Sequence, residues 1–130
     1  MPSPIIVRPA VESDFDAVAR ITRDSYLAAG YFDDAEHPYM RKVQDVAQRA
    51  GQATVWVAER AGDVVGSVTL ALAGEPYADI ALPDELEFRM LVVDPAVQRS
   101  GAGKAMVTAI IEHARSLPGI RAVALTTGET

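Results

Sequence analysis

The stretch LVVDPAVQRSGAGKAM, residues Leu91–Met106, passes from an apolar run through a turn that carries two glycines into a helical pattern. The run LEFRMLVV, Leu86–Val93, alternates at first and then becomes wholly apolar, which is typical of a central strand covered on both faces. An aspartate-proline pair ends this strand. Small and apolar side chains then recur at helical spacing from Ala102 to His113, before the sequence LPG. The stretch therefore predicts a strand, a glycine-bearing turn and a helix in direct succession.

Other segments of the chain also have the composition of strands. They are Ile5–Ala10, Thr54–Arg60, Val64–Leu72 and Arg121–Thr126. The second and third of these flank the short sequence AGD, which predicts a hairpin. The last one follows the helix described above. A strand, a helix and a strand in this order predict a right-handed parallel crossover.

Two helices are expected between the first strand and the hairpin. A capping box is predicted at the start of the first, with Ser13 as N-cap and Asp16 three residues later. The second is expected to begin at Pro38, in its favoured first-turn position, and to end at Gly51. The predicted order is therefore β-α-α-β-β-β-α-β. This order predicts an α/β fold in which helices cover a mixed sheet, as a single domain over residues 1–130.

Composition limits the functions that are open to the chain. Its 130 residues are 49% hydrophobic and 23% charged, which is typical of a globular domain. No apolar run is long enough to span a membrane, and the first residues do not resemble a signal peptide. The lack of cysteine excludes disulfides, thiolate metal ligands and a cysteine nucleophile, and it favours a cytoplasmic location. A net charge of -6 argues against nucleic acid as the main partner.

The two glycines of the turn suit a phosphate group. The first backbone N–H groups of a helix lack intrahelical partners and lie at the positive end of its dipole, so an anion is stabilised there. Gly101 and Gly103 leave room for a phosphate to approach, and Arg99 and Lys104 add positive charge. The same spacing is compatible with a connection that binds no ligand. Neither the Walker A motif nor the dinucleotide fingerprint fits, because each requires a further glycine that is missing here.

The sequence QRSGAG, Gln98–Gly103, resembles the Q/R-x-x-G-x-G/A loop of the GNAT superfamily of N-acetyltransferases. The strand before it, the helix after it and the predicted order of elements also resemble this family, over nearly the whole chain. The resemblance implies acetyl-CoA, or another acyl-CoA, as acyl donor, with its thioester in a gap where the fourth and fifth strands splay apart. The residues that it assigns to the cofactor are Leu91, Val92, Val93, Arg99, Ser100, Gly101, Ala102, Gly103 and Lys104.

Acyl transfer to an amine requires a neutral amine and stabilisation of an oxyanion. The resemblance implies Glu87 as the catalytic base that takes the proton of the ammonium group, often through water. Glu85, on the same face of the strand, is a weaker candidate. Either carboxylate can instead be a solvated acid at the end of a strand. The resemblance places the oxyanion donor on the backbone near Leu91.

Aromatic and acidic side chains gather around the segment that joins the first two helices. They are Tyr26, Tyr31, Phe32, Asp33, Asp34, Glu36 and Tyr39. This region resembles the edge of the family's fold that binds the acceptor, although packing and a solvated acidic loop are the alternatives. His37 and His113 lack the spacing of metal ligands, so no metal site is expected.

The leading hypothesis is an enzyme that transfers acetyl from acetyl-CoA to a primary amine by direct attack, with a small molecule or peptide as acceptor and no membrane partner. The alternatives are a non-catalytic acyl-CoA-binding or regulatory module and a structural half that completes its sheet with a partner chain. Members of the resembled family usually continue with a helix and two strands. We therefore expect either a longer polypeptide or a homodimer that pairs through Arg121–Thr126.

Overall fold

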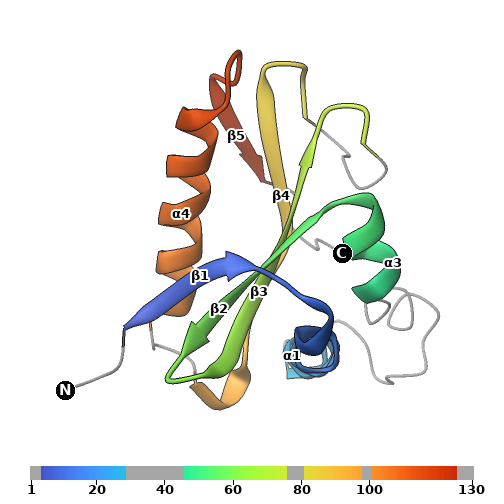
Figure 1. The fold of residues 1–130 in the computed structure, drawn as a ribbon, viewed down its shortest axis with the longest axis vertical. Coiled ribbons are helices and arrows are strands. Elements are labelled where there is room, and N and C mark those ends of the chain that lie inside the picture. The colour runs from blue at the N-terminus through green and yellow to red at the C-terminus, as the bar shows by residue number, and fades with distance from the viewer. Residues whose placement is uncertain (1–3, 29–45, 76–80, 98–100, 126–130) are drawn as a thin grey trace.

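The computed structural model describes residues 4–28, 46–75, 81–97 and 101–125, and Figure 1 shows their fold. Within these residues the strands form one sheet, in the spatial order β1 (Ile5–Pro9), β2 (Thr54–Arg60), β3 (Asp63–Leu72), β4 (Glu85–Val93) and β5 (Ala122–Leu125). Neighbours from β1 to β4 pair antiparallel, whereas β5 runs parallel to β4. The sheet is therefore mixed, with β4 between an antiparallel and a parallel neighbour.

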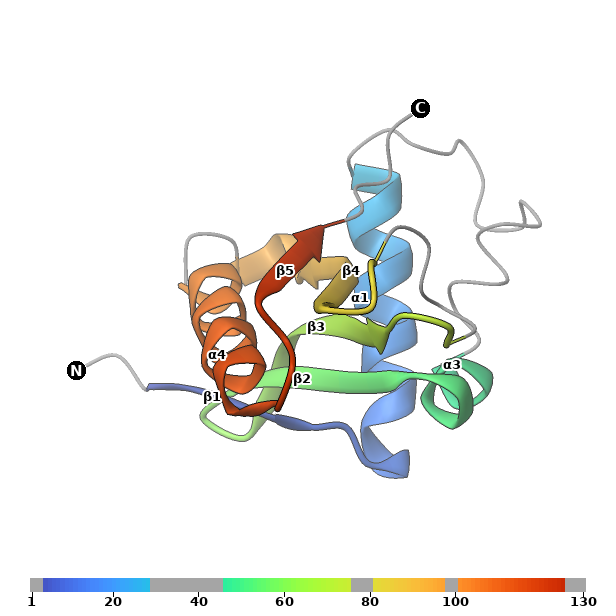
Figure 2. The ribbon, with the colours of Figure 1, turned by 90° about the horizontal axis from the view of Figure 1, so that it is seen from above.

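Helices cover both faces of this sheet (Figures 1 and 2). α1 (Phe15–Ala28) and α3 (Val46–Gln52) lie on one face, and α4 (Ala102–Ser116) lies on the other. Two short 3-10 turns complete the described elements: η1 (Glu12–Asp14) leads into α1, and η2 (Pro95–Val97) follows β4. The helix that follows β4 therefore lies on the face opposite the two described helices that precede β2.

The predicted α/β architecture and the order of its described elements are confirmed. The hairpin of β2 and β3 and the parallel pairing of β4 with β5 agree with the prediction. β3 and β4 each begin one residue earlier than predicted, and α4 continues to Ser116. α3 runs past Gly51, which was predicted to end it. Its predicted start, Pro38, and the end of the last predicted strand, Thr126, lie outside the described residues.

The sheet has an apolar core on each face. Facing α4, Leu70 of β3 and Val93 of β4 belong to one cluster with Met106. On the opposite face, Val92 packs in a cluster with Ile21 of α1. The apolar end of β4 therefore supplies both cores, which confirms the prediction of a central strand covered on both faces.

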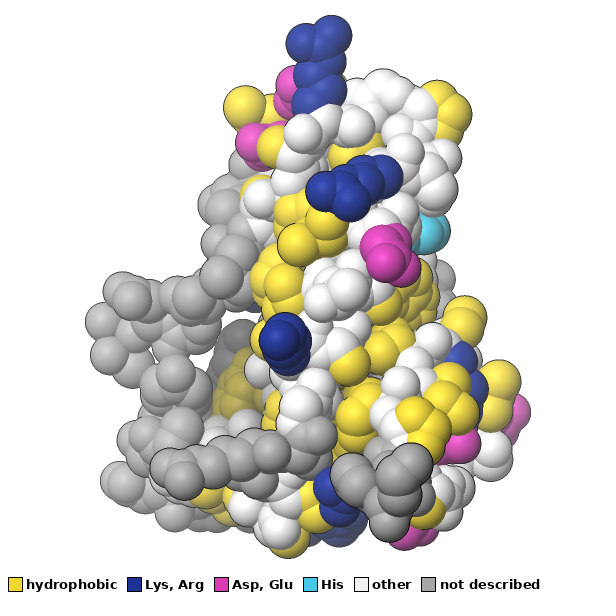
Figure 3. Space-filling view, turned by 90° about the vertical axis from the view of Figure 1, so that its left-hand side faces the viewer, with side chains coloured by type: hydrophobic (Ala, Val, Ile, Leu, Met, Phe, Trp, Pro, Cys, Tyr) yellow, Lys and Arg dark blue, Asp and Glu magenta, His cyan; other side chains and the backbone are white. Residues whose placement is uncertain are grey.

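Figure 3 shows the side of the molecule on which α4 lies. Hydrophobic side chains lie between separate Lys and Arg side chains on this side, and acidic side chains are interspersed with them. Among the large hydrophobic side chains of the described residues, Ile6 of β1 and Ile111 of α4 are exposed. The described part of this surface is therefore mixed in charge, without a continuous basic patch.

The start of α1 differs from the prediction. The capping box of Ser13 and Asp16 is not formed, because the preceding residues form η1 and α1 begins directly after it. Asp14 accepts hydrogen bonds from the Val11 N–H at 2.8 Å and from the guanidinium of Arg8 at 2.8 and 3.0 Å. Asp14 is buried, whereas Ser13 is exposed. A charge-assisted pair at a buried position outweighs an exposed serine cap, so the predicted capping box is wrong.

Replacement of Asp14 by asparagine is expected to lower the free energy of unfolding by about 2 kcal/mol at neutral pH. The hydrogen bonds from Arg8 hold the pKa of the Asp14 carboxyl below its ordinary value. Because this pKa is lower in the folded chain, the stabilisation is complete above the unfolded value of about 3.9 and is lost as the pH falls through the folded value. Urea unfolding of both proteins at pH 7 and in acid measures the difference, which should shrink in acid.

Asp24→Asn is the control for this prediction. The Asp24 carboxylate pairs with Arg20 and Arg23, but all three side chains are more than a third exposed. Solvent screens such pairs, so their loss should cost no more than about 0.5 kcal/mol. Equal losses of stability in the Asp14 and Asp24 variants would contradict the importance of burial at Asp14.

Candidate functional site

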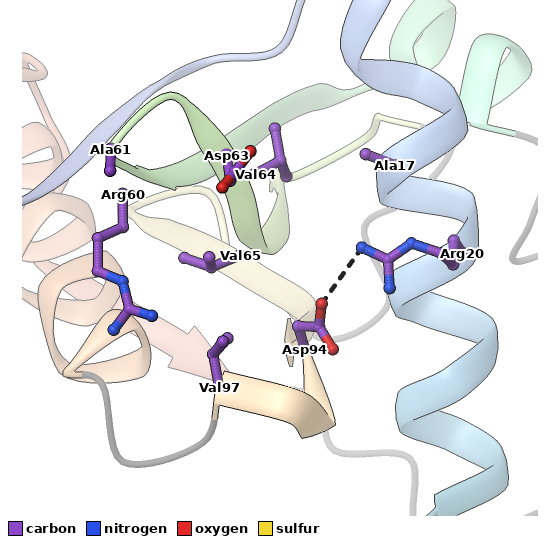
Figure 4. Close-up of a pocket in the computed structure, with 9 residues that line it drawn as sticks. All are labelled: Ala17, Arg20, Arg60, Ala61, Asp63, Val64, Val65, Asp94 and Val97. Carbon is purple, nitrogen blue, oxygen red and sulfur yellow. Dashed lines mark hydrogen bonds and ion pairs between the residues drawn. The ribbon is translucent and has the colours of Figure 1, made fainter.

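The connection from β4 to α4 is held in place at its start. The N–H of Asp94 donates to the carbonyl of Val65 at 2.8 Å, and the Asp94 carboxylate accepts the N–H of Ala96 at 3.0 Å. The Val97 N–H donates to the Asp94 carbonyl at 2.9 Å and closes η2. Arg20 of α1 donates to the same carboxylate at 3.2 Å (Figure 4). The end of β4 is thus tied to β3 and to α1 before the glycine-bearing turn begins.

This turn ends at the N-terminus of α4. Gly101 is the N-cap, with φ 88° and ψ 3°, and its carbonyl accepts the first helical hydrogen bond from the Ala105 N–H at 2.9 Å. Glycine adopts this left-handed conformation at little cost. A Cβ on Gly101 would meet no atom of the described residues within 4 Å, so these residues leave the space beside it open. An anion can therefore approach the first N–H groups of the helix from this side.

Several other residues that the resemblance assigns to the cofactor lie near Gly101. Lys104 is exposed, whereas the side chain of Ala102 is buried in the core, so only the backbone of Ala102 can face a ligand. A Cβ on Gly103 would lie 3.8 Å from a side-chain atom of β4, which is an ordinary contact. Packing therefore does not require glycine at position 103. Arg99 and Ser100 lie outside the described residues.

Among the described residues, β5 pairs with the first half of β4, and residues 126–130, which follow β5, lie outside them. β5 pairs only with Glu85–Phe88, whereas β3 pairs with β4 as far as Val93. Met90 has a φ of 55°, and Met90 and Leu91 together stand opposite a single residue of β3. This arrangement is a β-bulge. From the bulge to the end of β4, no strand of the described residues pairs with its β5 side. The gap between the two strands that the resemblance implies stays an expectation.

The three apolar residues at the end of β4 face different ways. The side chain of Val92 is 3% exposed and packs with Ile21 and Tyr26 under α1. Leu91 and Val93 are half-buried and pack on the α4 side of the sheet. Val92 can therefore meet a ligand only through its backbone groups, because its side chain is buried.

Glu87 lies in the paired half of β4. It stands opposite Ala71 of β3 and Ala124 of β5, and its side chain is 0% exposed. One carboxylate oxygen accepts the Ala81 N–H at 3.0 Å. Glu87 is therefore not a solvated acid. Glu85 is half-buried and accepts the N–H of the neighbouring loop residue 82 at 2.9 Å, which stabilises that loop.

Further polar side chains share the face on which Glu87 lies. Leu70 and Phe88 are opposite one another and belong to the α4-side core. Because side chains alternate along a strand, the residues directly before and after each of them point to the α1 and α3 side. Those residues include Thr69 as well as Glu87. Arg49 of α3 is 1% exposed and donates to the sulfur of Met90 at 3.0 Å. Neither Thr69 nor Arg49 was predicted as a site residue, because a threonine in a strand and an arginine in a helix carry no local signal of burial.

The remaining predicted candidates have packing roles or lie outside the described residues. Tyr26 of α1 is buried in a cluster with Val92 of β4. The half-buried Trp56 packs edge-on against the ring of His113, with centroids 5.1 Å apart. Outside the described residues are Tyr31, Phe32, Asp33, Asp34, Glu36, His37 and Tyr39. Within the described ranges, no group of His, Cys, Asp and Glu side chains could hold a metal ion. No helix among the described elements is long and apolar enough to cross a membrane.

A hollow of about 440 Å³ lies where α1, the β2–β3 turn and η2 meet (Figure 4). Arg20 and Asp94 form one wall, and Arg60 and Asp63 lie at the hairpin. None of the described residues that are assigned to the cofactor or to catalysis lines it. It is therefore distinct from the edge of β4 that faces β5.

Comparisons with known proteins agree with this geometry. The sequence profile described as "Acetyltransferase (GNAT) family" matches residues 15–130. A GNAT family acetyltransferase from Brucella melitensis in complex with acetyl-CoA is similar, with 22% identity, a TM-score of 0.69 and coverage of 98% of this chain and 78% of that one. A possible acetyltransferase from Clostridium difficile 630 gives 15% identity, a TM-score of 0.71 and coverage of 94% and 78%.

A third similar structure is an aminoglycoside acetyltransferase from an uncultured soil metagenomic sample, in complex with sisomicin. It gives 20% identity, a TM-score of 0.63 and coverage of 94% of this chain and 76% of that one. No curated protein matches the chain. The solved structures support the fold, and the profile match extends over most of the sequence. The chain therefore belongs to the acetyltransferase (GNAT) family and is an acyl-CoA-dependent N-acetyltransferase.

Proposed function

We propose that the protein transfers the acetyl group of acetyl-CoA to a primary amine by direct attack of the amine on the thioester. The observation that carries this proposal is the edge of β4 from the bulge at Met90 to its end, which has no partner strand among the described residues and precedes the N-terminus of α4 at Gly101. Because the chain contains no cysteine, an acyl-enzyme on a cysteine thiolate is excluded. Acetyl-CoA is bound in the Brucella melitensis neighbour, which supports the same donor here.

The two ends of this edge match the chemistry of an acyl-CoA. The amide groups of a pantetheine arm can pair with free backbone groups, and we assign this role to Leu91 and Val93. The pyrophosphate would be held by backbone N–H groups at the N-terminus of α4, those of Arg99, Gly101, Gly103 and Lys104. The exposed ammonium group of Lys104 adds positive charge beside them. When bound, acetyl-CoA supplies the activated acyl group.

The acceptor must lose a proton before it can attack. A primary amine is largely protonated at neutral pH, since its pKa is near the value of about 10.4 for lysine. We assign Glu87 as the base that receives this proton. The neutral nitrogen then bonds to the acyl carbon, and negative charge develops on the acyl oxygen. As this charge returns to the carbonyl, the carbon–sulfur bond breaks, and the remaining excess proton on the nitrogen passes to the CoA thiolate, which leaves as the free thiol. A backbone N–H near Leu91, at the bulge, would stabilise that oxyanion.

We propose a small-molecule or peptide amine as the acceptor. The neighbour that binds sisomicin supports testing polycationic amines first. A second copy of the chain is a further proposed partner, because β5 has no strand on its outer side within the described residues; light scattering tests this. The lack of cysteine supports a cytoplasmic location as part of the same proposal.

Release of free thiol from acetyl-CoA, measured with a panel of amines, tests the proposed reaction. The panel should contain an aminoglycoside, a polyamine, amino acids and a peptide with a free N-terminus. We expect acetyl-CoA to raise the melting temperature and at least one amine class to stimulate thiol release. A rise in melting temperature without amine-dependent release would favour the non-catalytic acyl-CoA-binding module. Failure of both would contradict the assignment of the acetyl-CoA site.

A further inference from the structure

The burial of Glu87 raises a problem for its proposed role. Its side chain has no exposed surface, so an acceptor amine cannot touch the carboxylate in this structure. A proton can nevertheless reach a buried base through an intervening group. The nearest candidates are polar side chains on the same face of the sheet. The inference that follows rests on the proposed function of Glu87.

Thr69 differs from the other buried hydroxyl groups of the described residues. Ser67 donates to the Trp56 carbonyl at 3.0 Å, and Thr22 donates to the Val18 carbonyl at 2.7 Å. The Thr69 hydroxyl is also buried, with its residue 1% exposed, but it has no hydrogen-bond partner among the described residues. A buried hydroxyl without a partner is costly, and such groups in native proteins commonly bind an ordered water.

The strand register brings Thr69 close to Glu87. Thr69 stands opposite Arg89, and Ala71 stands opposite Glu87, so Thr69 and Glu87 are diagonal neighbours on the same face. Diagonal neighbours in an antiparallel pair are about 7–8 Å apart. One water with two hydrogen bonds of about 2.8 Å joins oxygens that are about 5 Å apart. Side chains that extend toward one another from diagonal positions can bring their oxygens to this separation, which one water spans.

We propose that Thr69 is a positioning residue for proton transfer to Glu87. Its O–H donates to the oxygen of one water, and this orients a hydrogen of that water toward the Glu87 carboxylate. The water passes this hydrogen to Glu87 as it takes a proton from the acceptor ammonium. The amine becomes neutral, Glu87 becomes a carboxylic acid, and the water is regenerated. Thr69 itself neither gains nor loses a proton.

Thr69→Val tests this proposal because valine keeps the shape and removes the hydroxyl. We expect kcat at neutral pH to fall about 10-fold, while the KM for acetyl-CoA stays unchanged. The loss should shrink at high pH, where more of the acceptor is already neutral. The melting temperature should equal or exceed that of the wild type, since a buried hydroxyl is removed. Thr69→Ser keeps the hydroxyl and should restore most of the activity.

Two further variants separate this role from a general effect of packing. Thr22→Val makes the same substitution at a buried threonine of α1 and should leave kcat unchanged. In the Glu87→Gln background, Thr69→Val should cause no further loss, because the proton acceptor is already absent. An unchanged kcat in Thr69→Val, or a further full loss in the double variant, would overturn the role of Thr69. A wild-type protein without amine-dependent turnover would instead overturn the proposed function itself.

Discussion

Replacing Glu87 by glutamine is expected to lower kcat at neutral pH about 10²-fold or more, while acetyl-CoA binding persists. Glutamine has nearly the same shape, and its carbonyl oxygen can still accept the Ala81 N–H that the carboxylate accepts now. It cannot accept a proton from the acceptor. The proposed cofactor contacts lie at the bulge and beyond, outside the part of β4 that pairs with β5, so they should be unaffected. Steady-state thiol release and an acetyl-CoA thermal shift measure the two effects.

The pH dependence distinguishes a base from a structural residue. The deficit of the Glu87 variant should diminish as the pH approaches the pKa of the acceptor amine, because a neutral amine needs no base. Glu85→Gln is the matched control on the same strand. Glu85 is half-buried and contacts a loop N–H, so its replacement should change kcat by less than about 3-fold. An unchanged neutral-pH rate in Glu87→Gln would reduce that residue to a structural role.

Replacement of Gly101 by valine is expected to abolish acetyl-CoA binding, with a loss of affinity of about 100-fold or more. At a φ of 88° a β-branched residue is strongly disfavoured, so the first turn of α4 would have to change. The valine side chain would also enter the open space through which a phosphate would approach. Calorimetric titration with acetyl-CoA and the ligand-dependent rise in melting temperature both measure this loss.

Gly74→Val controls for backbone strain alone. Gly74 has a φ of 87°, and, as at Gly101, no atom of the described residues lies within 4 Å of its Cβ position. Gly74, however, follows β3 rather than preceding α4. Its replacement should lower the melting temperature by a similar amount and leave acetyl-CoA binding intact. If both variants lost binding equally, global destabilisation would explain the result. If the Gly101 variant kept full binding, the assignment of the phosphate to this turn would be wrong.

Much of the fold could be predicted because its signals are local. Turn residues separate the strands of the hairpin, and the glycine-bearing turn lies between an apolar strand and a helical stripe. The start of α1 could not be predicted in this way. It depends on Arg8, which pairs with Asp14 nearby and with Glu59 in another strand. A serine with an acidic residue three positions later is a weaker determinant than this tertiary contact.

The backbone elements of the candidate site could be predicted from the sequence, but the burial and the neighbours of its side chains could not. The motif located the turn at Gly101, and the position of Glu87 relative to it singled out that residue. Its complete burial could not be foreseen, because an alternating strand with charged residues normally indicates a solvated face. Here α1 and α3 cover that face. Thr69 comes near Glu87 only because of the register between β3 and β4. This register joins segments that are distant in the sequence, so it could not be predicted from local patterns.

The bulge at Met90 has a consequence for deletions in β4. Removing one residue from a strand ordinarily turns every following side chain to the other face. In β4, Leu86 and Phe88 before the bulge and Leu91 and Val93 after it all lie on the α4 side. Deletion of Met90 alone would leave these four side chains on the α4 side of the sheet. It would also restore regular pairing between β3 and β4. The residue that the hydrophobic pattern could spare is thus the bulge residue itself, and its deletion is expected to give a more regular sheet without the bulge beside which we propose the cofactor binds.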